Sequence, residues 1–109
     1  MKAPAPLFVH AFDLTAWVLG RFGERPDALS RELCAKALAL LDAVTLALQD
    51  RERELRLTDA DELLVGLRMR LRLAGQLGGL DERQLMHVLG LADSVGRQIG
   101  GWQKRLARA

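Results

Sequence analysis

The apolar residues of this chain recur every three or four positions in four separate segments. Because an α-helix has about 3.6 residues per turn, this spacing places the apolar side chains on one face of a helix. Such a face must be covered by partner helices of similar length. No sheet signal competes with these helical patterns. The clearest stripe consists of Leu85, Val88, Ala92, Val95, Ile99, Trp102 and Leu106.

Helix-starting and helix-stopping residues divide the pattern into four helices. Asp27 follows Pro26 and is a suitable N-cap for the second helix. Thr58 opens a segment with acidic residues in its first turn, which resembles a capping box. Gly78 and Gly79 end the third helix, and Asp81 opens the fourth. The expected helices span about 7–22, 27–53, 58–77 and 81–106.

The junction between the second and third helices has the weakest boundary signals. Residues 50–57 favour helix themselves, and the first five of them alternate acidic and basic side chains. The second helix is therefore expected to continue through much of this segment. A tight turn would then precede Thr58. In the first helix, the inner stripe is expected to be Phe8, Ala11, Phe12, Thr15, Val18, Leu19 and Phe22.

A chain of 109 residues suits one domain with one core. Short connections favour antiparallel neighbours, so the expected fold is an all-α, up-down-up-down four-helix bundle spanning residues 1–109. Apolar residues remain beyond the inner stripes, namely Trp17 and a second row at Leu63, Leu73 and Leu77. Because one bundle of this size would not bury them all, a homo-oligomer is also expected.

Composition indicates a solvated, mildly basic chain. The formal net charge is +2, and residues 56–109 carry nine basic and six acidic side chains. The opening residues lack a secretion signal, and charged residues interrupt every leucine-rich stretch, so no membrane-spanning segment is expected. Cys34 is the only cysteine, which excludes an intrachain disulfide and favours a cytoplasmic location.

Few residues offer catalytic chemistry. His10 and His87 have no further ligands at metal-binding spacing, and Cys34 has the position of an inert buried thiol. The Gly78-Gly79 pair does not fit a phosphate-binding loop, which needs a longer glycine pattern. We therefore expect no enzymatic activity, no cofactor and no metal.

Basic residues of the last two helices are the best candidates for binding. Arg68 and Arg72 share one side of the third helix, and a second basic group ends the fourth. In an antiparallel bundle that end lies near Lys2, Arg51, Arg53 and Arg56. The pole is either solvated and half neutralised by nearby acids, or a docking surface for phosphates. The candidate nucleic-acid-binding residues are Arg68, Arg72, Arg97, Lys104, Arg105 and Arg108.

The fourth helix also contains an unusual number of glycines. Each interior glycine costs about 1 kcal/mol relative to alanine. Gly96 and Gly100 are four residues apart and lie on one face. Two interpretations remain open: close packing within the bundle, or contact between subunits.

Several short segments of the chain form a pattern of order and spacing. They are Phe12-Asp13, Trp17, Phe22, Pro26, Leu71-Arg72-Leu73-Ala74, Leu77-Gly78-Gly79-Leu80, Gly100-Gly101-Trp102 and Lys104. This pattern resembles the accessory variability determinant family of diversity-generating retroelements. That family is similar in fold to four-helix proteins encoded in intervening sequences of bacterial ribosomal RNA.

The resemblance implies a barrel-like homopentamer that is not an enzyme. It implies a positive surface that binds the reverse transcriptase of the retroelement and its RNA or RNA–DNA. Arg72 and Arg68 match basic positions of the helix 3 motif, and Lys104 matches the basic end. The first hypothesis is therefore a nucleic-acid- and polymerase-binding adaptor. The alternative is a protein–protein interaction or structural bundle with no nucleic-acid role.

Overall fold

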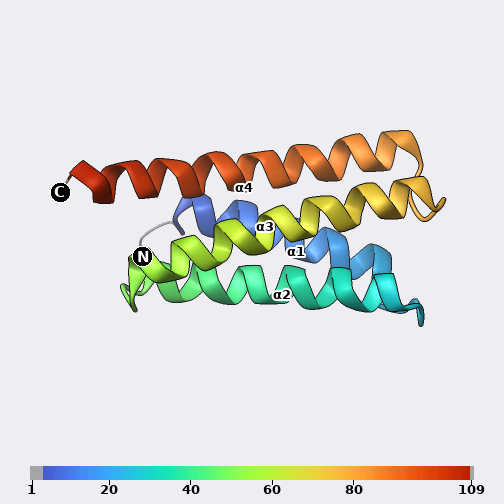
Figure 1. The fold of residues 1–109 in the computed structure, drawn as a ribbon, viewed down its shortest axis with the longest axis horizontal. Helices are drawn as coiled ribbons and strands as arrows, with labels where there is room; N and C mark the ends of the chain where they lie inside the picture. The colour runs from blue at the N-terminus through green and yellow to red at the C-terminus, as the bar shows by residue number, and fades with distance from the viewer. Residues whose placement is uncertain (1–3, 109) are drawn as a thin grey trace.

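The computed structural model describes residues 4–108 as four helices joined by short turns. They are α1 (Pro6–Phe22), α2 (Ala28–Leu48), α3 (Arg53–Gln76) and α4 (Glu82–Arg108). Within this part of the chain each helix contacts the helices next to it in sequence, and α1 also contacts α4. The diagonal pairs do not touch. This is the expected all-α, up-down-up-down four-helix bundle (Figure 1).

The core contains apolar residues from all four helices, and the stripe expected in α4 is at its centre. Val88, Ala92, Val95 and Ile99 are fully buried. The remaining three stripe residues are half-buried and pack against the core. Figure 1 shows the C-terminal end of α4 extending beyond the ends of the other helices, so Leu106 at this end has fewer neighbours.

One residue of α1 that was expected to face the core is exposed to solvent. The side chain of Phe12 is 51% exposed, whereas Leu7 and Leu14 are fully buried. Successive residues turn by about 100° around a helix, so Phe12 is far from the buried line through Ala11 and Val18. Its ring contacts Phe8 instead, with 5.8 Å between the centroids.

The predicted boundary between the second and third helices was wrong. α2 ends at Leu48 rather than near residue 53, and α3 begins at Arg53 rather than at Thr58. Thr58 lies inside α3, where its hydroxyl donates to the carbonyl of Glu54. The helix-favouring residues 53–57 therefore form the start of α3.

A Schellman motif explains why α2 stops without a glycine or proline. The amide of Asp50 donates to the carbonyl of Ala47, and the amide of Arg51 donates to that of Leu46. This geometry requires a left-handed residue, and Asp50 occupies the position with φ 58°. Glu52 is also left-handed, with φ 51°. Because glycine usually fills such a position, the end of α2 could not be recognised from the residue types here.

Replacing Asp50 with glycine is expected to stabilise the fold by about 1 kcal/mol, because glycine adopts positive φ without steric strain. The ion pair that is lost joins Asp50 to Arg53 at 3.7 Å and is largely exposed, so it contributes little. The check is the urea midpoint at constant m-value. Gln49→Gly is the matched control: Gln49 has φ −88°, so this change should destabilise.

The other helix ends follow the sequence signals. Asp81 and Gln84 form a reciprocal capping box, in which each side chain accepts from the other's amide. Gly78, with φ 84°, ends α3 in a second Schellman motif, and the amide of Gly79 donates to the carbonyl of Ala74. Asp27 caps α2 by accepting from the amide and hydroxyl of Ser30.

The cap at Asp27 predicts a specific acid sensitivity. The two hydrogen bonds from Ser30 lower the pKa of Asp27 below its ordinary value of 3.8. The folded pKa is thus below the unfolded one, so the stabilisation is present above pH 3.8 and is lost as the pH falls through the folded value. Thermal unfolding should show wild type above Asp27→Ala in Tm at pH 5. The difference should shrink on acidification below pH 3.8.

Candidate nucleic-acid interface

The net positive charge of the bundle is concentrated on α4. This helix carries five basic residues and two acidic ones, a net charge of +3. By the same count α3 has five basic and four acidic residues, a net charge of +1, and α1 and α2 are neutral. The positive charge of the helices is therefore greatest on α4.

Three candidate residues lie on one exposed face of α4. Arg97, Lys104 and Arg108 are seven and four residues apart, so they project from the same side of the helix, and all three are exposed. At 1.5 Å per residue they span about 16 Å. We call these three residues the α4 basic face. Lys104 and Arg108 lie toward the C-terminal end of α4 that extends past the other helices in Figure 1.

Glycines on α4 leave open space beside this face. A Cβ atom added at Gly90, Gly100 or Gly101 would meet no atom within 4 Å. These glycines therefore have no packing role within the subunit, although each weakens the helix. Missing side chains let another molecule approach the helix closely. Gly96 differs, because its added Cβ would lie 3.0 Å from the guanidinium of Arg68.

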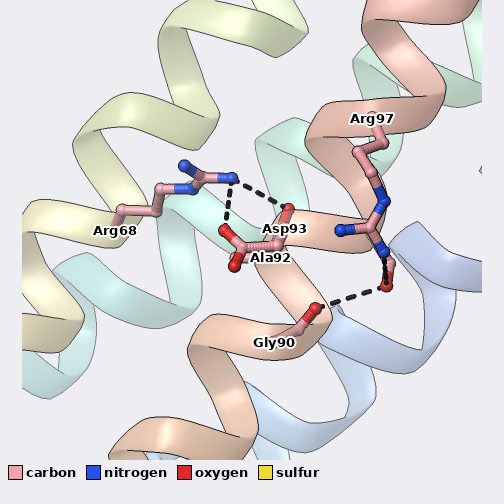
Figure 2. A network of polar contacts seen from close by, with 6 residues as sticks. Arg68, Gly90, Ala92, Asp93 and Arg97 are labelled. Carbon is pink, nitrogen blue, oxygen red and sulfur yellow. Dashed lines mark hydrogen bonds and ion pairs between the residues drawn. The ribbon is translucent and has the colours of Figure 1, made fainter.

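Arg68 is not a free cation. Figure 2 shows its side chain crossing from α3 to α4, where Nη2 lies 2.9 Å from a carboxylate oxygen of Asp93. The same nitrogen donates to the carbonyl of Ala92 at 3.4 Å. Gly96 leaves room for this crossing. Arg68 therefore joins α3 to α4, and Asp93 neutralises its charge. Arg72, one turn further along α3, is exposed.

A hydrogen bond to a residue one turn earlier on α4 holds the side chain of Arg97 near the helix surface. Its Nη2 donates to the hydroxyl of Ser94 at 3.3 Å, and that hydroxyl donates to the carbonyl of Gly90 (Figure 2). Neither partner is charged. Arg97 therefore keeps its full charge for a ligand, in contrast to Arg68.

Removing the carboxylate of Asp93 is expected to strengthen nucleic-acid binding. Asp93→Asn removes one of two acids on α4 and frees Arg68, so affinity should rise several-fold at about 0.1 M salt. The measurement is fluorescence anisotropy with a labelled RNA. Asp42→Asn makes the same charge change at an exposed position on α2 and serves as control. Equal gains from both variants would show that net charge alone matters.

The expected basic pole forms only in part. Arg53 and Arg105 both contact Trp102, with their guanidinium carbons 4.9 and 4.5 Å from the ring centroid. Arg53 also donates to the carbonyl of Ala47 and so caps α2. Arg56 instead pairs with Glu52 and lines the groove between α2 and α3. Lys2 lies outside the described residues.

The stack around Trp102 was missed by the sequence analysis. Arg53 and Trp102 are 49 positions apart, and only the register of α3 against α4 brings them together. The indole was expected in the apolar stripe, and it is half-buried there. Its role is also to hold two guanidinium groups through cation–π contacts, each worth about 0.5–1 kcal/mol at an exposed site. Arg105 is thus oriented before any ligand binds.

Residues with catalytic potential remain scattered. Within residues 4–108 no three His, Cys, Asp or Glu side chains come close enough to hold a metal ion. Burial raises the pKa of the Cys34 thiol, which disfavours the reactive thiolate. None of the four helices, over the part of the chain described, is long and apolar enough to cross a membrane.

The chain matches no protein-family model, and no curated protein or solved structure shows significant similarity to it. The fold and the candidate interface therefore define a four-helix bundle whose largest net positive charge lies on α4.

Proposed function

We propose that this protein is a non-enzymatic accessory protein that binds nucleic acid through α4 and acts as a homo-oligomer. The observation that carries the proposal is the α4 basic face, in which three exposed cations lie beside helix positions without side chains. Phosphate contacts need cations that are free of intramolecular partners. Arg97, Lys104 and Arg108 are free of acidic partners among the described residues, whereas Arg68 is not.

The face has the dimensions of a short stretch of sugar–phosphate backbone. Its span of about 16 Å corresponds to about five nucleotides at 3.4 Å per nucleotide of a duplex strand. Without side chains at Gly100 and Gly101, the backbone can approach the helix between the cations. Such contacts recognise charge and not sequence, so the proposed binding is non-specific.

Self-association is the second part of the proposal, and an apolar row on α3 supports it. Val65, Met69, Leu73 and Leu77 are four residues apart and between 43% and 70% exposed. Met86 on α4 is also exposed. Leu63, which was expected in this row, is instead half-buried and lines the groove between α2 and α3. A row of large apolar side chains on a small domain favours contact with another subunit.

The finer description rests on the resemblance to the accessory variability determinant family. In that description the oligomer is a barrel-like homopentamer, and its partners are a reverse transcriptase and RNA or RNA–DNA. Five copies of the α4 basic face in a ring would multiply a weak contact per subunit. Copurification with a retroelement reverse transcriptase tests the partner directly, and a reverse transcriptase gene beside this one would be the first candidate.

Binding to RNA, duplex DNA and an RNA–DNA hybrid across a salt series tests the first part. Three phosphate contacts per subunit predict a log–log slope of about −2.7 per bound subunit on a duplex. Micromolar protein that fails to bind any of them at about 50 mM salt would overturn nucleic-acid binding. Salt-insensitive self-association without such binding would support the alternative, a protein-interaction bundle, for which the apolar row on α3 is the specific evidence.

A further inference from the structure

A groove between α1 and α4 is lined by residues that are not part of the α4 basic face. It is open to solvent and has a volume of about 560 Å³, which is within the range of small-molecule sites. Its walls come from one face of α1 and from the first turns of α4, near the end of the bundle opposite Lys104 and Arg108. The lining residues are Ala16, Trp17, Gly20, Arg21, Arg83, Gln84 and His87.

The groove combines an aromatic surface with cations and contains no carboxylate among its lining residues. The indole of Trp17 is half-buried, and the ring of His87 lies 6.1 Å from it at a tilt of 49°. Because the rings are tilted, the imidazole does not cover the indole as a parallel stack would. An aromatic ligand can therefore lie against Trp17 with cations on two sides.

Arg21 is held in place by the neighbouring turn. Its Nη2 donates to the carbonyl of Gly79 at 2.9 Å and lies 3.5 Å from the side-chain oxygen of Gln84. These partners are uncharged, so the guanidinium retains its positive charge at the groove. Arg83 is exposed on the opposite wall. Two arginines of this kind are suited to a phosphate, which accepts hydrogen bonds from the planar guanidinium fork.

Small residues on α1 leave the space that forms the groove. Gly20 lies in the last turn of α1, where glycine still favours helix less than alanine. A Cβ atom added there would meet nothing within 4 Å, so packing within the subunit does not require the glycine. The space above it is part of the groove. Ala16, one turn earlier, also projects little into it.

We propose that this groove binds a nucleoside phosphate, with the base against Trp17 and the phosphate between Arg21 and Arg83. Stacking on an aromatic side chain does not discriminate strongly between bases. Inorganic phosphate would make no stacking contact with the indole, and an uncharged aromatic compound would make no charged contact with the two arginines. The proposal goes beyond the function proposed for α4, because Arg97, Lys104 and Arg108 do not line the groove.

Fluorescence of Trp17 provides the test. Trp102→Phe removes the other tryptophan, and circular dichroism checks that the variant remains helical. Adding AMP should quench the remaining emission with half-saturation below about 1 mM. Adenosine and inorganic phosphate should each bind at least tenfold more weakly. Equal binding of AMP and inorganic phosphate, or no saturation with AMP, would overturn the proposal.

Two variants in the same background locate the site. Arg83→Gln should weaken AMP binding tenfold or more, whereas the matched control Arg97→Gln should leave it unchanged. Gly20→Leu should abolish binding by filling the groove while keeping the helix, since leucine favours helix more than glycine. Retained AMP binding in a folded Gly20→Leu variant would overturn the proposal.

The same measurements separate this site from the α4 basic face and identify the source of the nucleotide. RNA binding that is weakened several-fold in Arg97→Gln, with AMP binding retained, would mean that the two sites are independent. A 5′-phosphorylated oligoadenylate that binds at least tenfold more tightly than AMP, and is sensitive to Arg83→Gln, would assign the ligand as the end of a strand. Equal binding would assign it as a free nucleotide.

Discussion

Replacing Arg97, Lys104 and Arg108 together with glutamine is expected to weaken RNA and duplex binding by two to three orders of magnitude at about 0.1 M salt. Each phosphate contact contributes about 0.9 to the log–log salt slope, so three lost contacts remove about 2.7 logarithmic units at that salt concentration. The slope itself should fall by the same amount. Fluorescence anisotropy at several salt concentrations measures both quantities.

A second triple variant shows whether position or total charge causes the effect. Arg25→Gln, Arg31→Gln and Lys36→Gln remove the same charge from α2 and from the turn that precedes it. Because these residues lie away from the α4 basic face, this variant should lose no more than about tenfold. Equal losses in the two variants would contradict a defined interface on α4. All six positions lie at least partly exposed, so both variants should remain folded.

Local chemistry explains why most of the fold could be predicted from the sequence. The capping box at Asp81 and the glycine at Gly78 act within one or two turns, so their residues can be recognised without a structure. The end of α2 depends on Asp50 in a left-handed conformation. Aspartate adopts this conformation less readily than glycine, and the neighbouring residues contain no signal that predicts a left-handed residue here. The error at this junction therefore came from backbone geometry rather than from hydrophobic pattern.

The candidate site could be predicted less completely, because it depends on the register between helices. The spacing of Arg97, Lys104 and Arg108 places them on one face without further information. That Asp93 neutralises Arg68 follows only from how α3 is aligned against α4. The groove at Trp17 likewise requires the alignment of α1 against α4, since Arg83 is 66 positions further along the chain.

α3 and α4 have different roles in the proposal. α4 carries the largest net positive charge, while α3 carries a row of large exposed apolar residues. A charged helix resists close contact with its own copies, whereas an apolar row favours it. We therefore infer that subunits meet through α3 and leave the α4 basic face in contact with solvent and ligand.

Met69→Glu combined with Leu73→Glu is expected to convert the oligomer into a monomer. The two side chains are 55% and 43% exposed in the subunit, so the change should not disturb the core. Burying two carboxylates without partners at a subunit contact costs several kcal/mol, more than a small interface can offset. Light scattering at tens of micromolar should give 12.1 kDa for the variant, against about 60 kDa for a wild-type pentamer.

Leu38→Glu provides the control for this change. Leu38 is 46% exposed but lies on α2, away from the row on α3, so this variant should keep the mass of the wild type. A monomeric wild type would contradict self-association altogether. An oligomer that survives Met69→Glu and Leu73→Glu would place the subunit contact on another face, and Met86 and the open glycines of α4 would then be the next positions to substitute. Because a ring adds one basic face per subunit, loss of the oligomer should also make the salt slope of RNA binding shallower.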